Sequence, residues 1–246
     1  MDLLERVRAV HGDAWQIQGR FRERFGGGAQ ELHGIRVMAS GLPHAEFNGG
    51  DVTAPDADLE GARAFYAARG VAWGVRVPTC MPWTHGKRLR GLRLMGLETD
   101  AQRRVRPVPG LIVRAGIPHD IDAVLAVDAV AYGTDPTSRG PWWAPMLGAT
   151  AMTVAVAELD RVPVGTGYVV HTDGRGGPAM HLGGIGVLPA ARGRGVGAAL
   201  SSWLLDVGWA RGARLAELQA DTDAAAHVYA RLGFFEAGGL DVYVEL

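Results

Sequence analysis

The chain has 246 residues, of which 48% are hydrophobic, and its formal net charge at pH 7 is -1. This length allows one large domain or two small ones with a substantial core. The balanced charge argues against a nucleic-acid partner, and no apolar run approaches the roughly 20 residues that cross a bilayer. The single cysteine, Cys80, excludes an intrachain disulfide and a cysteine-based zinc cage. We expect a soluble, cytoplasmic protein with no membrane or nucleic-acid partner.

The N-terminal region contains segments typical of an α/β protein. Residues 59–70 have a helical pattern and residues 72–77 have a strand pattern. Arg24, Gly27 and Ala29 fit a bare R-x-x-G-x-A phosphate-binding pattern, but no apolar strand leads into them and no long amphipathic helix follows. We interpret this stretch as a flexible glycine turn.

A charged, proline-bearing segment separates the N-terminal region from the rest of the chain. It covers residues 100–110 and has the composition of a linker. We therefore predict a smaller N-terminal α/β domain at residues 1–102, a linker at residues 103–110 and a second domain at residues 111–246.

The second domain alternates predicted helices and strands, which indicates an α/β fold with a mixed, mostly antiparallel sheet. In chain order we expect a strand at 111–114, a helix at 120–132, a hairpin of 152–159 and 162–171 turning at Asp160 and Arg161, a strand at 180–187, a helix from Val196 to about Gly212, a strand at 215–222, a helix at 224–234 and a last strand ending at 242–244.

A glycine-rich loop lies between the predicted strand 180–187 and the helix that follows. The first N–H groups of a helix lack partners and carry partial positive charge, and glycine lets phosphate oxygens approach them closely. The loop therefore resembles a pyrophosphate-binding site. Its residues are Arg192, Gly193, Arg194, Gly195, Val196, Gly197 and Ala198.

Two families bind phosphate with such a loop. Gly193, Gly195 and Ala198 fit the G-x-G-x-x-A pattern of dinucleotide-binding proteins, and Glu217 lies near the position of their ribose-binding acid. However, residues 188–192 intervene between the strand and the first glycine, whereas that pattern follows its strand directly. A dinucleotide-dependent oxidoreductase is therefore the more distant alternative.

Residues 185–200 closely resemble the acetyl-CoA motif of the GNAT superfamily of N-acetyltransferases. Arg192, Gly195 and Gly197 occupy the family's Gln/Arg-x-x-Gly-x-Gly/Ala positions, after a V-x-P step. Residues 224–234 resemble a second family motif, the A-x-x-x-Y-x-x-x-G-F helix, with Tyr229 as its tyrosine.

The resemblance implies the GNAT fold, acetyl-CoA as acyl donor without a metal, and the amine of a small molecule or peptide as acceptor; it also allows a homodimer. Because residues 93–98 loosely echo residues 231–236, we also hypothesise that the N-terminal half is a degenerate GNAT-like domain without its own coenzyme site, as in tandem family members. The residues expected to bind the coenzyme are Ile185, Gly186, Val187, Arg192, Gly193, Arg194, Gly195, Val196, Gly197 and Ala198, with Gly183 and Gly184 forming a bulge in the strand.

Two further residues are predicted to be catalytic. An alkylamine with a pKa near 10.4 is mostly protonated at neutral pH, so such an acceptor requires a general base or a path for the proton to water, whereas an α-amino group near pKa 8 needs far less help. The resemblance points to Glu217 as the base, with a water relay as the alternative. Tyr229 is expected near the coenzyme sulfur, where its hydroxyl stabilises the departing thiolate. The alternatives are a glutamate paired on the surface with Arg214 and a tyrosine packed on the sheet.

The acceptor site is the least determined part of the sequence. By resemblance it involves Asp135, Trp142, Trp143, His171 and His181, although core packing explains the tryptophans equally well. Thr222 stands where many relatives have a coenzyme-binding asparagine, and a threonine there can cap the following helix instead. A non-catalytic acyl-CoA sensor remains the alternative to an enzyme.

Overall fold

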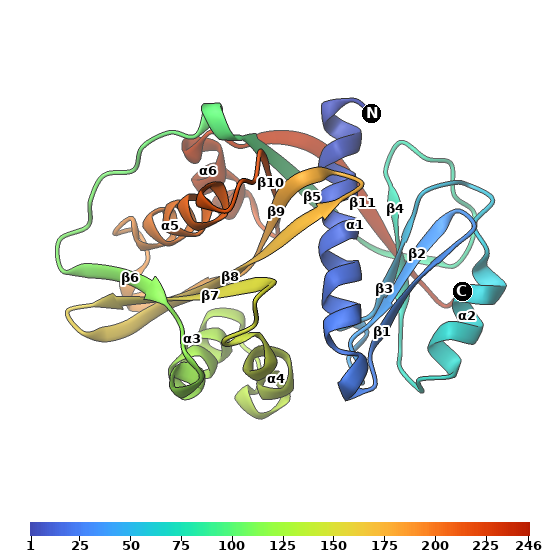
Figure 1. Ribbon diagram of the computed structural model, residues 1–246, viewed down its shortest axis with the longest axis horizontal. Helices are drawn as coiled ribbons and strands as arrows, with labels where there is room; N and C mark the ends of the chain where they lie inside the picture. Colours follow the sequence, from blue (N-terminus) through green and yellow to red (C-terminus); the bar gives the residue numbers. More distant parts are fainter.

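The computed structural model describes residues 1–246 and contains one eleven-stranded sheet with helices on both faces (Figure 1). The strand order in the sheet is β1-β2-β3-β4-β11-β5-β10-β9-β8-β7-β6. The helices and strands are α1 (Leu3–Phe21), β1 (Gly28–Leu32), β2 (Ile35–Ala39), β3 (Gly49–Val52), α2 (Leu59–Ala67), β4 (Gly74–Pro78), β5 (Lys87–Glu98), β6 (Leu111–Ala115), α3 (Ile121–Tyr132), α4 (Pro136–Trp143), β7 (Met152–Leu159), β8 (Val162–Gly174), β9 (Gly177–Val187), α5 (Val196–Ala210), β10 (Leu215–Ala220), α6 (Asp223–Leu232) and β11 (Phe235–Val244).

The sheet has an internal repeat. Read from either end towards the middle, strands β1 to β4 and strands β7 to β10 follow the same order, and β6 is added outside β7. In each half the third and fourth strands are parallel, β3 with β4 and β9 with β10, whereas every other neighbouring pair is antiparallel. A helix joins the parallel strands in both halves, α2 in the first and α5 in the second.

The two halves exchange their last strands at the centre of the sheet. β5, from the first half, pairs with β10, and β11, from the second half, pairs with β4. β5 and β11 also pair with each other. The sheet therefore runs without a break through both halves, and the domain limits given above stay predictions.

Helices cover the sheet differently in its two halves. In the C-terminal half α5 and α6 lie on one face, while α3 and α4 lie on the other (Figure 1). The largest hydrophobic cluster lies beneath α5 and α6 and includes Leu182, Leu200 and Leu218. α1 contacts strands from both halves, among them β2, β8 and β10.

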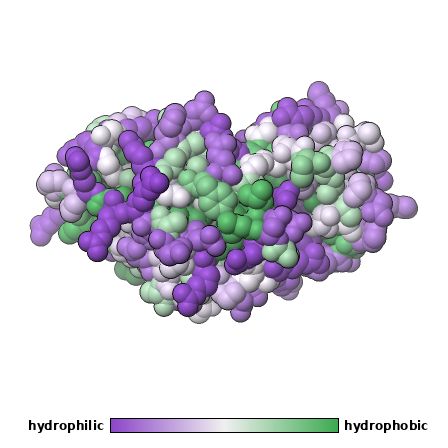
Figure 2. All heavy atoms as spheres, turned by 90° about the horizontal axis from the view of Figure 1, so that it is seen from above, coloured by the Kyte–Doolittle hydropathy of each residue, from purple (hydrophilic) through white to green (hydrophobic).

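From above, the surface is mainly hydrophilic, and hydrophobic atoms gather between its two lobes (Figure 2).

Helix α1 has a polar buried face, which explains why hydrophobic periodicity did not predict it. The helix begins with a capping box, in which Asp2 accepts from the Glu5 amide at 2.8 Å and Glu5 accepts from the Asp2 amide at 3.1 Å. Such a box satisfies two donors at the helix start. Its buried side chains include His11, Asp13, Gln16 and Gln18. His11, Asp13 and Gln16 have partners in the sheet, and Gln18 contacts the sulfur of Met146, so this helix depends on tertiary contacts.

The structure confirms the predicted elements of the C-terminal half with small shifts at their ends. Asp160 and Arg161 form the expected hairpin turn, with φ values of 51° and 69°. Two left-handed residues in succession are the signature of a tight β-hairpin. None of the helices combines the length and the apolar character needed to pass through a lipid bilayer.

Candidate active site

The site begins where the parallel strands β9 and β10 separate. Their pairing ends at Leu182 and Leu218, while β9 continues beside β8 to Val187. Gly184 and Ile185 together stand opposite the single residue Gly167, which is a β-bulge one residue beyond the predicted Gly183 and Gly184. Gly184 has a φ of 59°, a conformation that glycine adopts without strain. The separated strands leave a cavity of about 600 Å³ between them.

The glycine loop closes one end of this cavity. Gly193 and Gly195 have φ values of 74° and 88°, and α5 begins at Val196. No amide from Gly193 to Ala198 has a main-chain acceptor. These N–H groups lie at a helix start, where an anion is stabilised by the helix dipole. Arg192 fixes the loop by donating to the carbonyls of Val187 at 3.0 Å and Ala131 at 3.3 Å.

The cavity brings together most of the residues predicted from the sequence. Arg194 is exposed and is not part of the wall, and Glu217 is buried behind it. The predicted residues that line the cavity are Ile185, Gly186, Val187, Arg192, Gly193, Gly195, Val196, Gly197, Ala198 and Tyr229.

Tyr229 faces the cavity from α6 and is only 8% exposed. Burial raises the pKa of its phenol well above the ordinary value, and the nearby Asp221 raises it further. The hydroxyl is therefore protonated at neutral pH and can act as a hydrogen-bond donor. Its ring also packs against Phe234 with a centroid separation of 5.9 Å, so Tyr229 contributes to both the core and the cavity wall.

Tyr132 is a cavity residue that the sequence did not reveal. Its hydroxyl donates to the Ile185 carbonyl at 3.0 Å, and its ring lies beside Gly186. Tyr132 is the last residue of α3, a helix whose sequence contains no family motif, so only the packing of α3 on β9 shows its position.

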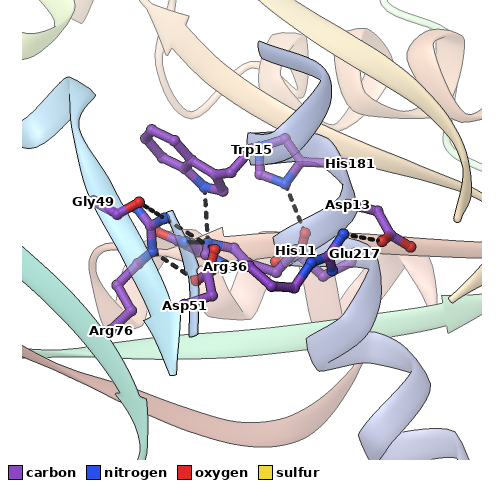
Figure 3. A network of polar contacts seen from close by, with 10 residues as sticks. His11, Asp13, Trp15, Arg36, Gly49, Asp51, Arg76, His181 and Glu217 are labelled. Carbon is purple, nitrogen blue, oxygen red and sulfur yellow. Dashed lines mark hydrogen bonds and ion pairs between the residues drawn. The ribbon is translucent and has the colours of Figure 1, made fainter. Parts of the chain in front are cut away.

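His181 and Glu217 form a buried pair close to the cavity, and neither is among the residues that line it. They lie opposite each other on β9 and β10, and Nδ1 of His181 is 2.6 Å from Oε2 of Glu217 (Figure 3). Glu217 is 0% exposed and does not contact Arg214, whereas His181 is 8% exposed. Because a carboxylate only accepts, Nδ1 of His181 carries the proton in this contact, and in the neutral imidazole the lone pair is then on Nε2. Nε2 has no hydrogen-bond partner and retains accessible surface.

A second series of polar contacts connects α1 to the cavity wall. Gln219 lines the cavity and contacts Nε2 of His11. Trp15 donates to the same nitrogen at 3.0 Å, and Nδ1 of His11 is 3.0 Å from Asp51 on β3. An indole N–H only donates, so His11 directs its own proton to Asp51. The N-terminal half thus contacts a residue of the cavity wall.

Most of the predicted acceptor residues have other roles. Trp142 and Trp143 are buried in the core, with Trp142 stacked on Phe47 at a centroid separation of 4.4 Å. Asp135 is exposed and caps α4 through the Thr137 amide. None of these residues lines the cavity.

Two further residues of the predicted site have defined partners. His171 is 3.2 Å from the Thr153 hydroxyl and lies outside the cavity wall. Thr222 caps α6 by accepting from the Ala225 amide at 3.1 Å, and it also lines the cavity. The capping alternative for Thr222 is therefore confirmed.

The geometry of the cavity agrees with a match to a known protein family. Residues 124–234 match the model of the Acetyltransferase (GNAT) family. The C-terminal half carries a GNAT domain. The match includes the bulged strand β9, the glycine loop and the Tyr229 helix, and the mixed sheet differs from the parallel sheet of a dinucleotide-binding domain.

Solved structures share the fold of the whole chain and not only of the GNAT domain. A GCN5-related N-acetyltransferase from Kribbella flavida has a TM-score of 0.74 and 19% identity, with 100% of this chain and 97% of that chain covered. A functionally unknown conserved protein from Staphylococcus epidermidis has a TM-score of 0.64 and 18% identity, with 89% and 94% covered. A putative GNAT acetyltransferase from Novosphingobium aromaticivorans has a TM-score of 0.58 and 18% identity, with 94% and 95% covered.

No curated protein sequence matches this chain. The structural likenesses extend through residues 1–102 as well as the GNAT domain. The expectation that the N-terminal half is GNAT-like in structure is therefore confirmed, in agreement with the internal repeat of the sheet.

Proposed function

We propose that the protein transfers the acetyl group of acetyl-CoA to a primary amine of a small molecule or peptide. One observation carries this proposal: the parallel strands β9 and β10 separate beside a glycine loop at the start of α5. The opening supplies unpaired amides for a pyrophosphate and free main-chain groups for an extended arm. A cavity of about 600 Å³ is large enough for the reacting end of such a coenzyme.

In this proposal each part of the cavity wall binds a different part of the coenzyme. The amides of residues 193–198 bind the pyrophosphate, while Arg192 holds the loop against β9. The pantetheine arm follows β9 from Ile185 to Val187, where backbone groups pair with it as with a neighbouring strand. Tyr229 donates a hydrogen bond to the sulfur as the thioester bond breaks, which stabilises the developing thiolate.

We further propose that His181 accepts the proton of the attacking amine, with Glu217 as a positioning residue. Glu217 is fully buried, so it cannot contact an amine directly. Its carboxylate holds the Nδ1 proton of His181 and leaves the Nε2 lone pair available. The amine nitrogen then attacks the acetyl carbon, its proton passes to Nε2, and the thiolate departs.

Thermal unfolding with and without acetyl-CoA tests coenzyme binding, with NAD as the control ligand. A specific ligand at about 100 times its Kd stabilises the folded state by about 2.7 kcal/mol. We expect the melting temperature to rise with acetyl-CoA and to stay unchanged with NAD. Stabilisation by NAD alone would overturn the proposal.

Thiol release tests catalysis in the same samples. The expected result is coenzyme release that depends on an amine, measured over a panel that includes polyamines, amino acids, aminoglycosides and peptides with free N-termini. Acetyl-CoA stabilisation without release on any of these amines would favour the non-catalytic sensor.

A further inference from the structure

A second cavity lies in the N-terminal half, between α1 and the sheet. Its volume is about 560 Å³. It opens where the pairing of the parallel strands β3 and β4 ends, at Asp51 and Arg76. It is therefore the counterpart, in the repeated half, of the cavity between β9 and β10. Nothing in the proposed acetyl transfer uses this space.

Arginine side chains dominate the polar wall of this second cavity. Arg36 and Arg76 come from β2 and β4 and are each only 6% exposed, whereas Arg8 of α1 is partly buried and Arg175 of the β8–β9 turn is exposed. Figure 3 shows Arg36 and Arg76 on the side of the sheet that faces α1. Four guanidinium groups around one cavity are an unusual concentration of hydrogen-bond donors.

Two nearby carboxylates accept hydrogen bonds from two of these arginines. Asp51 accepts from Arg76 at 2.7 and 3.0 Å and also faces His11. Asp13, behind the cavity wall, accepts from Arg36 at 2.7 Å and from the Gly176 amide at 2.8 Å. The buried charges are thus paired inside the protein, as buried ions require.

Several guanidinium donors nevertheless remain without an acceptor. Nη1 of Arg36 has no hydrogen-bond partner and keeps accessible surface. Arg8 contacts only the sulfur of Cys80, at 3.2 Å, and has no carboxylate partner. Arg175 shares Glu31 with Arg36, at 2.8 and 3.1 Å. The remaining wall carboxylate, Glu5, accepts from the Asp2 amide.

Gly12 of α1 leaves space for the guanidinium group of Arg36. A Cβ atom on Gly12 of α1 would lie 2.8 Å from Nη1 of Arg36. The absence of a side chain at Gly12 therefore leaves room for the guanidinium under the helix. The donor group is built into the fold and does not belong to a mobile surface side chain.

The cavity is not a second coenzyme site. Residues 53–58, which lead into α2, contain no glycine and no arginine, and Asp58 caps the helix by accepting from the Gly61 amide. A carboxylate at this helix start would repel a pyrophosphate. His11 forms part of the wall and contacts Gln219 of the coenzyme cavity, so this pair of side chains connects the walls of the two cavities.

We propose that this second cavity binds a small multivalent anion, either a polycarboxylate or a phosphorylated metabolite. Its oxygens accept from the free donors of Arg8, Arg36 and Arg175. This ligand site is separate from the coenzyme cavity, and its occupation does not depend on the proposed acetyl transfer.

Cys80 provides a direct reporter of this site. It is the only cysteine of the chain, it is exposed, and it lines the cavity beside Arg8. The experiment measures the rate at which neutral dithiodipyridine labels Cys80 in the full-length protein, at increasing citrate or inorganic pyrophosphate and at constant ionic strength. Citrate represents the carboxylate class and pyrophosphate the phosphate class.

We expect at least one of the two anions to slow the labelling in a saturable manner. The double variant Arg8→Gln with Arg175→Gln should need at least about tenfold more anion for the same protection. Arg63→Gln is the matched control, because Arg63 is exposed on α2 and lies outside the cavity. It should behave as the wild type.

Two results would overturn the proposal: no protection of the wild type by either anion, or equal protection of the wild type and the double variant. Unfolding curves and acetyl-CoA stabilisation are recorded on the same samples. They verify that the double variant is folded, and they show failure of the coenzyme proposal independently of failure at this second site.

Discussion

His181 is the residue whose proposed role can be tested most sharply, because the need for a base depends on the acceptor. An alkylamine must lose a proton before it attacks, whereas an aromatic amine of low pKa is already neutral at pH 7. We predict that His181→Asn lowers kcat/KM by about 100-fold for an alkylamine, and much less for an aromatic amine.

The comparison between acceptors separates a chemical role of His181 from a structural one. Glu217→Gln should produce a smaller loss with the same preference, since Glu217 acts through His181. Steady-state kinetics with both acceptors, together with acetyl-CoA affinities, provide the measurement. An equal loss for both acceptors would show that His181 supports the structure rather than the proton transfer.

His171 gives a prediction about pH and stability. Burial, together with the nearby Arg211, lowers the pKa of this imidazole from 6.5 to about 4 in the folded protein. Between these values the unfolded chain binds a proton that the folded chain does not, so stability falls as the pH falls from about 6.5 towards 4. We expect the loss to be about 1 to 2 kcal/mol, because His171 is only partly buried.

Urea unfolding of the wild type and of His171→Asn across this pH range measures the effect. The variant should lose less stability between pH 6.5 and pH 4.5 than the wild type. Identical slopes in the two proteins would mean that another group causes the acid sensitivity.

At the scale of single residues, most of the site residues predicted from the sequence line the cavity. The glycine loop could be found because its main-chain requirements appear as a local glycine pattern, and Tyr229 could be found because the residues around it resemble a family motif. The pairing of Glu217 with His181 could not, since it depends on the register of β9 against β10. Tyr132 was missed for the same reason: it reaches Ile185 only through the packing of α3.

Among the elements, strand β9 requires its bulge to open the coenzyme cavity. A Cβ atom on Gly184 would lie 2.8 Å from Trp143, and the φ of 59° disfavours any other residue. We predict that Gly184→Ala lowers the free energy of unfolding by about 1 to 3 kcal/mol and weakens acetyl-CoA binding.

Gly212→Ala is the matched control for this change in β9. Gly212 has a φ of 90°, with nothing within 4 Å of an added Cβ, and it does not line the cavity. Its replacement should lower stability through the backbone alone and leave acetyl-CoA affinity unchanged. Calorimetric titration measures the acetyl-CoA affinity of both variants. An affinity equal to that of the wild type in Gly184→Ala would contradict the role of the bulge.

The sequence predicted some helices and strands and missed others. α3, α5 and α6 have the spacing or motifs of helices, and the hairpin β7–β8 has alternating residues and a clear turn. α1 was not predicted, because its buried face carries His11, Asp13, Gln16 and Gln18, which hydrophobic periodicity does not detect.

For the whole molecule, the exchange of β5 and β11 joins the two halves into one continuous sheet. β10 pairs with β5 along Leu215 to Ala220, and the largest cluster of the core includes Met95 and Leu97 from β5. A sheet edge exposed by removing β5 would leave unpaired main-chain groups. We predict that residues 103–246 do not fold alone and that co-expression with residues 1–102 restores a soluble complex.

Circular dichroism and size-exclusion chromatography of the fragments test this dependence. The matched control is the full chain cleaved after folding at a protease site placed in the linker, which should keep both pieces together. A folded, monomeric fragment 103–246 would contradict the account. The exchange could not be predicted from sequence, because it concerns which strands pair and not which residues form strands.

The central claim is that the coenzyme binds between β9 and the start of α5, and acetyl-CoA titration of two Ala198 variants tests it most directly. Ala198 lies in the first turn of α5 and lines the cavity. A glutamate there is compatible with the helix dipole but repels a pyrophosphate, whereas glutamine has nearly the same size without charge. We predict that Ala198→Glu binds acetyl-CoA at least about tenfold more weakly than Ala198→Gln, with both variants folded. Equal affinity in the two variants would contradict this location of the coenzyme.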